Sequence, residues 1–189
     1  MRDNFTRLNF GWLGYFLPDE KTVGTQPDQI EFVTSKAAAW DCPVSLHAEP
    51  DKLARHPRTD DILEVFRRWE EVRACRWLTG EQKQMLRDPA QEFILLLDEK
   101  GAFELVPYER VATVAGGSRE VIAYLFERKG ALYAVYNHIS ADKRLELPLD
   151  PDGLFVLENL GDARAAAAGE RGATAVVPLG KRRYLRTSV

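Results

Sequence analysis

The sequence predicts a chain of two parts: an incomplete α/β fragment over residues 1–90 and an all-β antiparallel sandwich over residues 91–189. Three observations lead to this fold class. Strand and helix patterns alternate in the first part, and the helical period disappears after residue 90. Short alternating segments then recur between glycine-containing turns, and this spacing is typical of an antiparallel sandwich.

The first part opens as a β-α-β unit. Residues 5–12 alternate in polarity and predict a strand. Thr25 as a hydroxyl cap, followed by Pro27, predicts the start of a helix, and Pro43 predicts its end because proline disfavours helical geometry in the residue before it. Residues 44–48 alternate again and predict a buried second strand, so the helix connects two strands that we expect to be parallel.

Two further helices are expected before the pattern changes. Thr59 predicts the cap of an amphipathic helix over residues 60–77, after a polar loop over residues 49–58. Thr79 and Gln82 have the spacing of a capping box, which predicts a short helix to about residue 87.

The second part reads as a series of hairpins. Each predicted hairpin joins two alternating segments through a turn that contains glycine. The paired segments are residues 92–97 with 102–109, residues 120–127 with 131–137, and residues 144–149 with 154–158.

The α/β part is too small to close on itself. Two strands leave exposed edges, and a complete (β/α)8 barrel takes about 250 residues, so this part would supply about a quarter of one. We therefore expect missing strands, either upstream or on a partner chain.

Composition excludes several classes of function. A net charge of −3 gives no basic field for nucleic acid, and no apolar run reaches the roughly 18 residues of a membrane span. The N-terminus has no apolar signal core, so a cytoplasmic location is expected if Met1 is the genuine start. The two cysteines have no histidines at metal-ligand spacing, so no metal is expected. The sequence contains no glycine-rich phosphate loop, so no cofactor is expected either.

Four residues are candidates for a binding site near the carboxyl ends of the two strands, where α/β folds bind ligands. Trp12 ends the first strand, and an aromatic ring can stack on the C–H face of a sugar; the alternative is core packing. His47 lies on the polar face of the second strand and is either a hydrogen-bond donor to a ligand or a satisfied core histidine. Glu49 is either a site carboxylate or a solvated loop acid, and Asn9, predicted on the face opposite Trp12, is either a hydroxyl ligand or polar packing.

Other aromatic residues have weaker claims. Tyr15 is a loop aromatic. The tyrosines and the phenylalanine on the paired strands are expected in the sandwich core, with a sugar-binding face as the alternative; they are Tyr124, Phe126, Tyr133 and Tyr136.

Two runs resemble a known class of enzymes. The run KAAAWDCPVSL at residues 36–46 resembles the last helix-to-strand step of a glycoside hydrolase TIM barrel. The runs VIAYLFERKGALYAVYNH at residues 121–138 and LELPL at residues 145–149 resemble the β-sandwich that follows such barrels. The resemblance covers nearly the whole chain and implies that residues 1–90 are the last part of a (β/α)8 barrel.

The resemblance also implies a carbohydrate substrate. It makes the chain the C-terminal part of a carbohydrate-active enzyme, inactive alone because at least one of the two catalytic carboxylates would lie on earlier strands. No residue here matches a catalytic motif, so the catalytic residues, the sugar and the retaining or inverting mechanism stay open. Two alternatives remain: a structural accessory sandwich and a non-catalytic carbohydrate-binding module.

Overall fold

The computed structural model describes residues 9–97, 100–110, 121–128, 131–138, 143–146, 155–157, 165–166, 174–177 and 183–188. The chain divides into two compact units, residues 1–95 and 96–189, and each is described here by itself.

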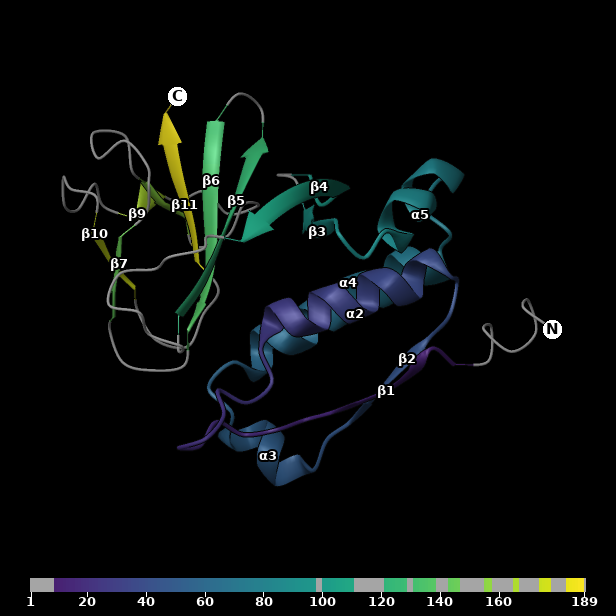
Figure 1. Cartoon of the computed structure of the whole chain (residues 1–189), viewed down its shortest axis with the longest axis horizontal. Coiled ribbons are helices and arrows are strands. Elements are labelled where there is room, and N and C mark those ends of the chain that lie inside the picture. The colour runs from purple at the N-terminus through teal and green to yellow at the C-terminus, as the bar shows by residue number, and fades with distance from the viewer. Residues whose placement is uncertain are drawn as a thin grey trace. The chain divides into compact units, whose positions relative to one another are not determined.

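Over its described residues, the first unit contains a parallel pair of strands and four helices, and it ends within the strand that follows them (Figure 1). The elements are β1 (Gly11–Gly14), α2 (Pro27–Ala39), β2 (Val44–His47), α3 (Pro50–Arg55), α4 (Thr59–Ala74) and α5 (Gly80–Arg87). Strands β1 and β2 pair in parallel, as the sequence predicted, with Gly11 opposite Val44 and Gly14 opposite His47. Helices α2 and α4 lie side by side, so the helix that connects the strands packs on the helix that follows them.

Apolar side chains at helical spacing build the core between α2 and α4. Ile30 and Ala37 of α2 are buried, as are Ile62, Trp69 and Val72 of α4. Complete burial of an aliphatic side chain of this size stabilises the fold by roughly 1.5–3 kcal/mol, so this interface accounts for much of the stability of the unit.

The acidic side chain of Glu31 lies inside this core. The Glu31 side chain is 1% exposed. Its Oε1 atom accepts hydrogen bonds from the indole Nε1 of Trp69 at 3.0 Å and from the backbone N–H of Leu95 at 2.9 Å. These bonds connect α2 to α4 and to the strand that contains Leu95, and the loss of either would leave a buried polar group unsatisfied at a cost of about 1–3 kcal/mol.

Two long basic side chains attach α5 and its C-terminal turn to α2. The Nζ atom of buried Lys36 donates to the carbonyl oxygens of Asp88 at 2.6 Å and of Gln91 at 2.9 Å. The Arg87 guanidinium donates to the Ala39 carbonyl oxygen from both Nε, at 3.2 Å, and Nη2, at 2.9 Å. It also lies 4.1 Å from the ring centre of Trp40. The contacts to Ala39 and Asp88 satisfy carbonyl groups at the C-terminal ends of α2 and α5, where intrahelical donors are missing, and the contact to Gln91 holds the loop that follows α5.

The later strands pair mostly antiparallel. They are β3 (Glu92–Leu97), β4 (Phe103–Arg110), β5 (Val121–Arg128), β6 (Ala131–His138), β7 (Lys143–Glu146), β8 (Phe155–Leu157), β9 (Ala165–Ala166), β10 (Thr174–Val177) and β11 (Arg183–Ser188). One sheet has the strand order β3-β4-β5-β6-β11-β8-β9, and β7 pairs separately with β10. The predicted β5–β6 hairpin is confirmed, since the two strands pair antiparallel from Val121 opposite His138 to Arg128 opposite Ala131.

The predicted fold class is wrong. Over the described residues, the parallel sheet has two strands and no barrel fragment is evident. The antiparallel strands join one extended sheet and one two-stranded ladder, which do not make the two facing sheets of a sandwich. Alternation and turn residues report pairing between neighbours in sequence. Pairings between distant segments, such as β6–β11 and β7–β10, decide the architecture and leave no local signal.

Several element boundaries also differ from the prediction. Strand β1 begins at Gly11, and residues 5–8 of the predicted strand lie outside the described part of the chain. The predicted loop after β2 contains helix α3, which begins at Pro50 because proline suits the first helical position. Among the described residues, the third predicted hairpin does not form, since β7 pairs with β10 while β8 pairs with β11 and β9.

Candidate functional site

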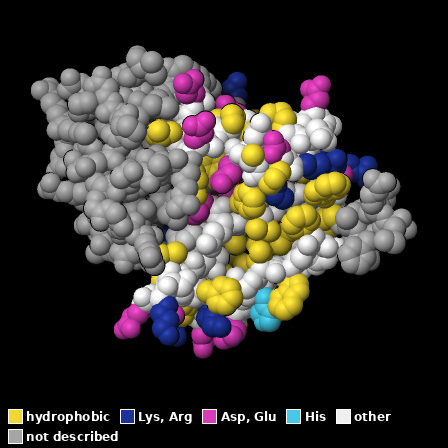
Figure 2. Space-filling view, in the orientation of Figure 1, with side chains coloured by type: hydrophobic (Ala, Val, Ile, Leu, Met, Phe, Trp, Pro, Cys, Tyr) yellow, Lys and Arg dark blue, Asp and Glu magenta, His cyan; other side chains and the backbone are white. Residues whose placement is uncertain are grey.

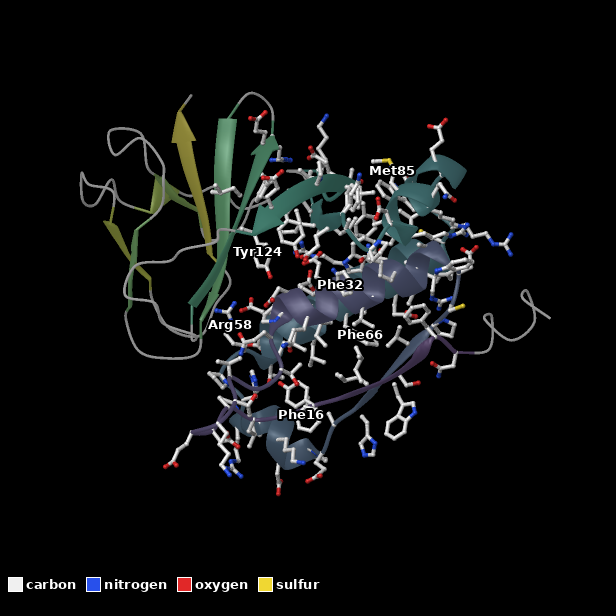
Figure 3. All side chains as sticks on the ribbon, viewed as in Figure 1. Phe16, Phe32, Arg58, Phe66, Met85 and Tyr124 are labelled. Atoms are coloured by element: carbon white, nitrogen blue, oxygen red, sulfur yellow. The ribbon has the colours of Figure 1, made fainter. Side chains whose placement is uncertain are left out.

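The parallel pair β1–β2 has one apolar face and one polar, aromatic face. In the register of the pair, Trp12 lies opposite Ser45 and Gly14 lies opposite His47. Because alternate residues of a strand share a face, these four positions lie together on one side of the pair. The other side carries Val44, which is buried, and half-buried leucines. Figure 3 shows the labelled Phe66 side chain between the helix pair and these strands, so we take the apolar side to face the helices.

Trp12 and His47 form the centre of the polar, aromatic face. The Trp12 side chain is 73% exposed and is the most exposed of the large hydrophobic residues in the described part of the chain. Its ring centre lies 5.8 Å from that of His47, with an angle of 30° between the ring planes. Figure 2 shows a histidine in cyan beside exposed hydrophobic side chains along the lower edge of the molecule. The core-packing alternative for Trp12 is therefore wrong, and His47 is not a core histidine.

Phe16 adds a second exposed ring to this face, and the sequence analysis missed it. A β-carbon at Gly14 would lie 2.7 Å from two ring atoms of Phe16, so the phenyl ring occupies the space that a side chain at Gly14 would fill. The ring is 63% exposed and is labelled in Figure 3. Together, Trp12, Phe16 and His47 form a surface that we call the aromatic platform. The sequence does contain a signal for this contact, because Gly14 ends the strand and the aromatic residue Phe16 follows two positions later.

Asn9 is also on this side of the pair, contrary to the prediction that it points away from Trp12. Its Nδ2 donates to the Ser45 hydroxyl at 2.9 Å, and its Oδ1 accepts from the backbone N–H of Gly11 at 2.8 Å. The strict alternation assumed for residues 5–12 does not hold at Asn9, because the regular strand begins only at Gly11. Asn9 therefore fixes the start of β1 and orients Ser45 beside Trp12.

Glu49 lies just beyond the carboxyl end of β2, where the sequence placed it. It is the N-cap residue of α3, and its side chain pairs with Lys52 at 2.8 Å. The hydrogen bond from Lys52 and the charge of Lys52 hold the pKa of Glu49 below its usual value, and His47 shifts the pKa in the same direction. Glu49 is consequently an exposed, ionised carboxylate near the platform.

Tyr15 is a buried residue that packs against Thr59 and His56 and is not part of the platform. It is buried, its hydroxyl lies 2.6 Å from the Thr59 hydroxyl, and its ring centre is 5.2 Å from that of His56. Burial raises the pKa of Tyr15 above its ordinary value. Burial lowers the pKa of His56, the backbone of Thr25 opposes this shift, and the positive charge of Arg58 adds to it. These residues brace the carboxyl end of the strand pair.

The aromatic residues of the second unit do not offer a sugar-binding face where they are described. Tyr124 and Phe126 are buried, and the Tyr124 ring centre lies 4.4 Å from that of Tyr108. The side chains of Tyr133 and Tyr136 lie outside the described residues. A pocket of about 410 Å³ occurs on β4 and β5; it is lined by Pro107, Tyr108, Glu109, Leu125, Phe126 and Glu127.

Metal and membrane signals are absent from the part of the chain that the structure describes. Within those residues, no three histidine, cysteine or acidic side chains gather into a possible metal site. Among the same residues, no helix has the length and apolar character needed to span a bilayer.

Among the described residues, the fold therefore brings the predicted site residues Trp12 and His47 together. It also places the exposed ring of Phe16 on the same face. Neither the protein-family models nor the curated protein sequences match this chain.

Proposed function

We propose that the first unit is a non-catalytic, carbohydrate-binding part of a carbohydrate-active protein, and that a sugar ring stacks on Trp12. The observation that carries the proposal is the 73% exposed indole of Trp12 beside an exposed imidazole. A large exposed aromatic ring costs solvation free energy unless a ligand or partner covers it.

The polar groups around Trp12 suit a sugar. A pyranose has apolar C–H faces and a rim of hydroxyl groups, so its binding needs an aromatic surface and neighbouring hydrogen-bonding groups. Ser45 lies opposite Trp12 in the register, and the His47 ring centre is 5.8 Å from that of Trp12. A hydroxyl and an imidazole both donate and accept hydrogen bonds, as hydroxyl recognition requires.

The state of Glu49 does not suit the general acid of glycoside hydrolysis. A general acid in glycoside hydrolysis needs a pKa raised toward neutrality so that it carries a proton. The pKa of Glu49 is shifted downward instead, by Lys52. The broader assignment to a glycoside hydrolase stays a prediction.

Titration with sugars, followed by NMR, tests the proposal. The indole signal of Trp12 is identified by its loss in Trp12→Phe, and methyl glycosides of glucose, galactose, mannose and xylose are then added with their β-1,4-linked trisaccharides. We expect a saturable shift of that signal with at least one sugar. Trp12→Ala should abolish binding, whereas Trp40→Ala, which removes a different exposed tryptophan, should retain it. Failure of every sugar to shift the Trp12 signal would contradict the proposal.

A further inference from the structure

We infer that the aromatic platform holds two adjacent units of an oligosaccharide, with one unit on Trp12 and the next on Phe16. This inference rests on the proposed function and names its ligand as a chain of sugars in place of a single one.

The two rings occupy successive positions on the same face of β1. Phe16 fills the side-chain position of Gly14, which is two residues from Trp12. Two residues along a strand span about 6.6 Å, so the two stacking positions are neighbours without overlapping. A single sugar ring on Trp12 leaves Phe16 exposed, and a second unit of the same chain would cover it.

Two polar side chains on β2 lie along the platform. Ser45 lies opposite Trp12, and His47 lies opposite Gly14, over which the Phe16 ring lies. The platform thus has one exposed ring on β1 and a second on the loop after it, beside a row of two hydrogen-bonding side chains on β2. A row of rings and hydrogen-bonding groups of this length suits a ligand that extends over more than one sugar unit.

The backbone holds Phe16 in place although it belongs to a loop. Its N–H donates to the Thr25 hydroxyl at 2.9 Å, and its carbonyl oxygen accepts from the Thr25 N–H at 2.9 Å. Gly24, at φ +70°, passes so close that a β-carbon there would lie 2.6 Å from the Phe16 carbonyl oxygen. Because these contacts fix the loop before binding, little ordering cost is added when a sugar arrives.

The test compares single sugars with trisaccharides on wild type and variants. For the sugar type that shifts the Trp12 signal, we expect the trisaccharide to bind about 5- to 10-fold more tightly than the methyl glycoside, the gain that one more aromatic contact provides. Phe16→Ala should remove this gain, so that the trisaccharide and the methyl glycoside bind the variant with nearly equal affinity. Trp12→Ala should weaken both ligands.

A second variant keeps Phe16 but displaces its ring from the platform. Gly14→Ala places a methyl group against the phenyl ring, whose atoms are the three nearest to the new carbon, so Phe16 must move. It should reproduce the effect of Phe16→Ala. Gly80→Ala is the matched control, because its added methyl group meets nothing within 4 Å.

Two outcomes separate this inference from the proposed function. If the methyl glycoside and the trisaccharide bind with equal affinity, and Phe16→Ala changes neither, the second stacking position is refuted while sugar binding at Trp12 stands. If wild type binds neither ligand, the proposed function fails and takes this inference with it.

Discussion

The carboxylate of Glu31 and the indole of Trp69 meet in the core between α2 and α4, with 3.0 Å between Oε1 and Nε1. The same carboxylate oxygen accepts the N–H of Leu95, so one buried acid connects two helices and β3. Removal of Glu31 would leave two buried donors without this acceptor, and each unsatisfied donor costs about 1–3 kcal/mol.

Glu31→Ala should therefore lower the free energy of unfolding by about 2–5 kcal/mol. Glu31→Gln keeps a carbonyl oxygen as acceptor and should lower it by less. Urea denaturation followed by tryptophan fluorescence measures both changes. Glu81→Ala, at an exposed site on α5, is the matched control and should change stability by less than about 0.5 kcal/mol. Equal effects of Glu31→Ala and Glu81→Ala would show that the buried acid is dispensable.

The protein should lose stability in mild acid because His56 is buried. Burial lowers its pKa below the ordinary value of 6.5, so the unfolded chain binds a proton more readily than the folded chain does. The free energy of unfolding should then decrease as the pH falls from 6.5 through the lower pKa of the folded state. His56→Asn retains an acceptor for the Arg58 N–H, which bonds to Nδ1 of His56 at 3.0 Å, and cannot be protonated. Denaturation at several pH values between about 5 and 8 should give a smaller slope for this variant. An unchanged slope would exclude His56 as the source.

Arg87 should be the main attachment of α5 to the C-terminus of α2. Arg87→Ala removes two hydrogen bonds to the Ala39 carbonyl oxygen and the stacking on Trp40, and should destabilise the protein by about 1–3 kcal/mol. Arg87→Lys keeps the charge without the planar fork and should recover only part of the loss. Thermal unfolding by circular dichroism compares the two variants with Lys21→Ala, at an exposed site in the loop after β1. Full recovery by lysine would show that charge alone matters.

Glu49 should titrate below 4.5, the ordinary value for glutamate. Lys52 causes most of this shift, by its hydrogen bond and its charge, so Lys52→Met should move the pKa of Glu49 upward toward that value. Carbon-detected NMR of the side-chain carboxyl group measures both values. A pKa above 4.5 in the wild type would remove the argument that Glu49 is no proton donor.

Local signals in the sequence predicted several elements well. Thr79 and Gln82 form the expected capping box, since the Thr79 hydroxyl accepts the Gln82 N–H at 3.2 Å and Gln82 Oε1 accepts the Thr79 N–H at 2.9 Å. The prediction that the hydroxyl of Thr25 caps α2 is wrong. Thr25 does not cap α2, because its hydroxyl accepts the Phe16 N–H and Gln26 occupies the cap position. A cap depends on three or four neighbouring residues, but a competing partner nine residues away is invisible to such a pattern.

The candidate site was predictable only in part for the same reason. Trp12 and His47 were identified because strand alternation and strand ends are readable in sequence. Phe16 was missed because its position depends on the path of a loop and on the empty side-chain site at Gly14. Glu31 was missed because a glutamate in an amphipathic helix normally faces water, and its two donors lie on distant segments.

The pair of hydrogen bonds between Phe16 and Thr25 closes the loop after β1 at its base, while its tip, at Glu20 and Lys21, is exposed. Extra residues inserted at the tip would add little closure entropy, because that term grows only with the logarithm of loop length. We therefore expect the tip of this loop to tolerate an inserted segment. A longer segment placed there could reach over the aromatic platform while Trp12 and Phe16 kept their positions.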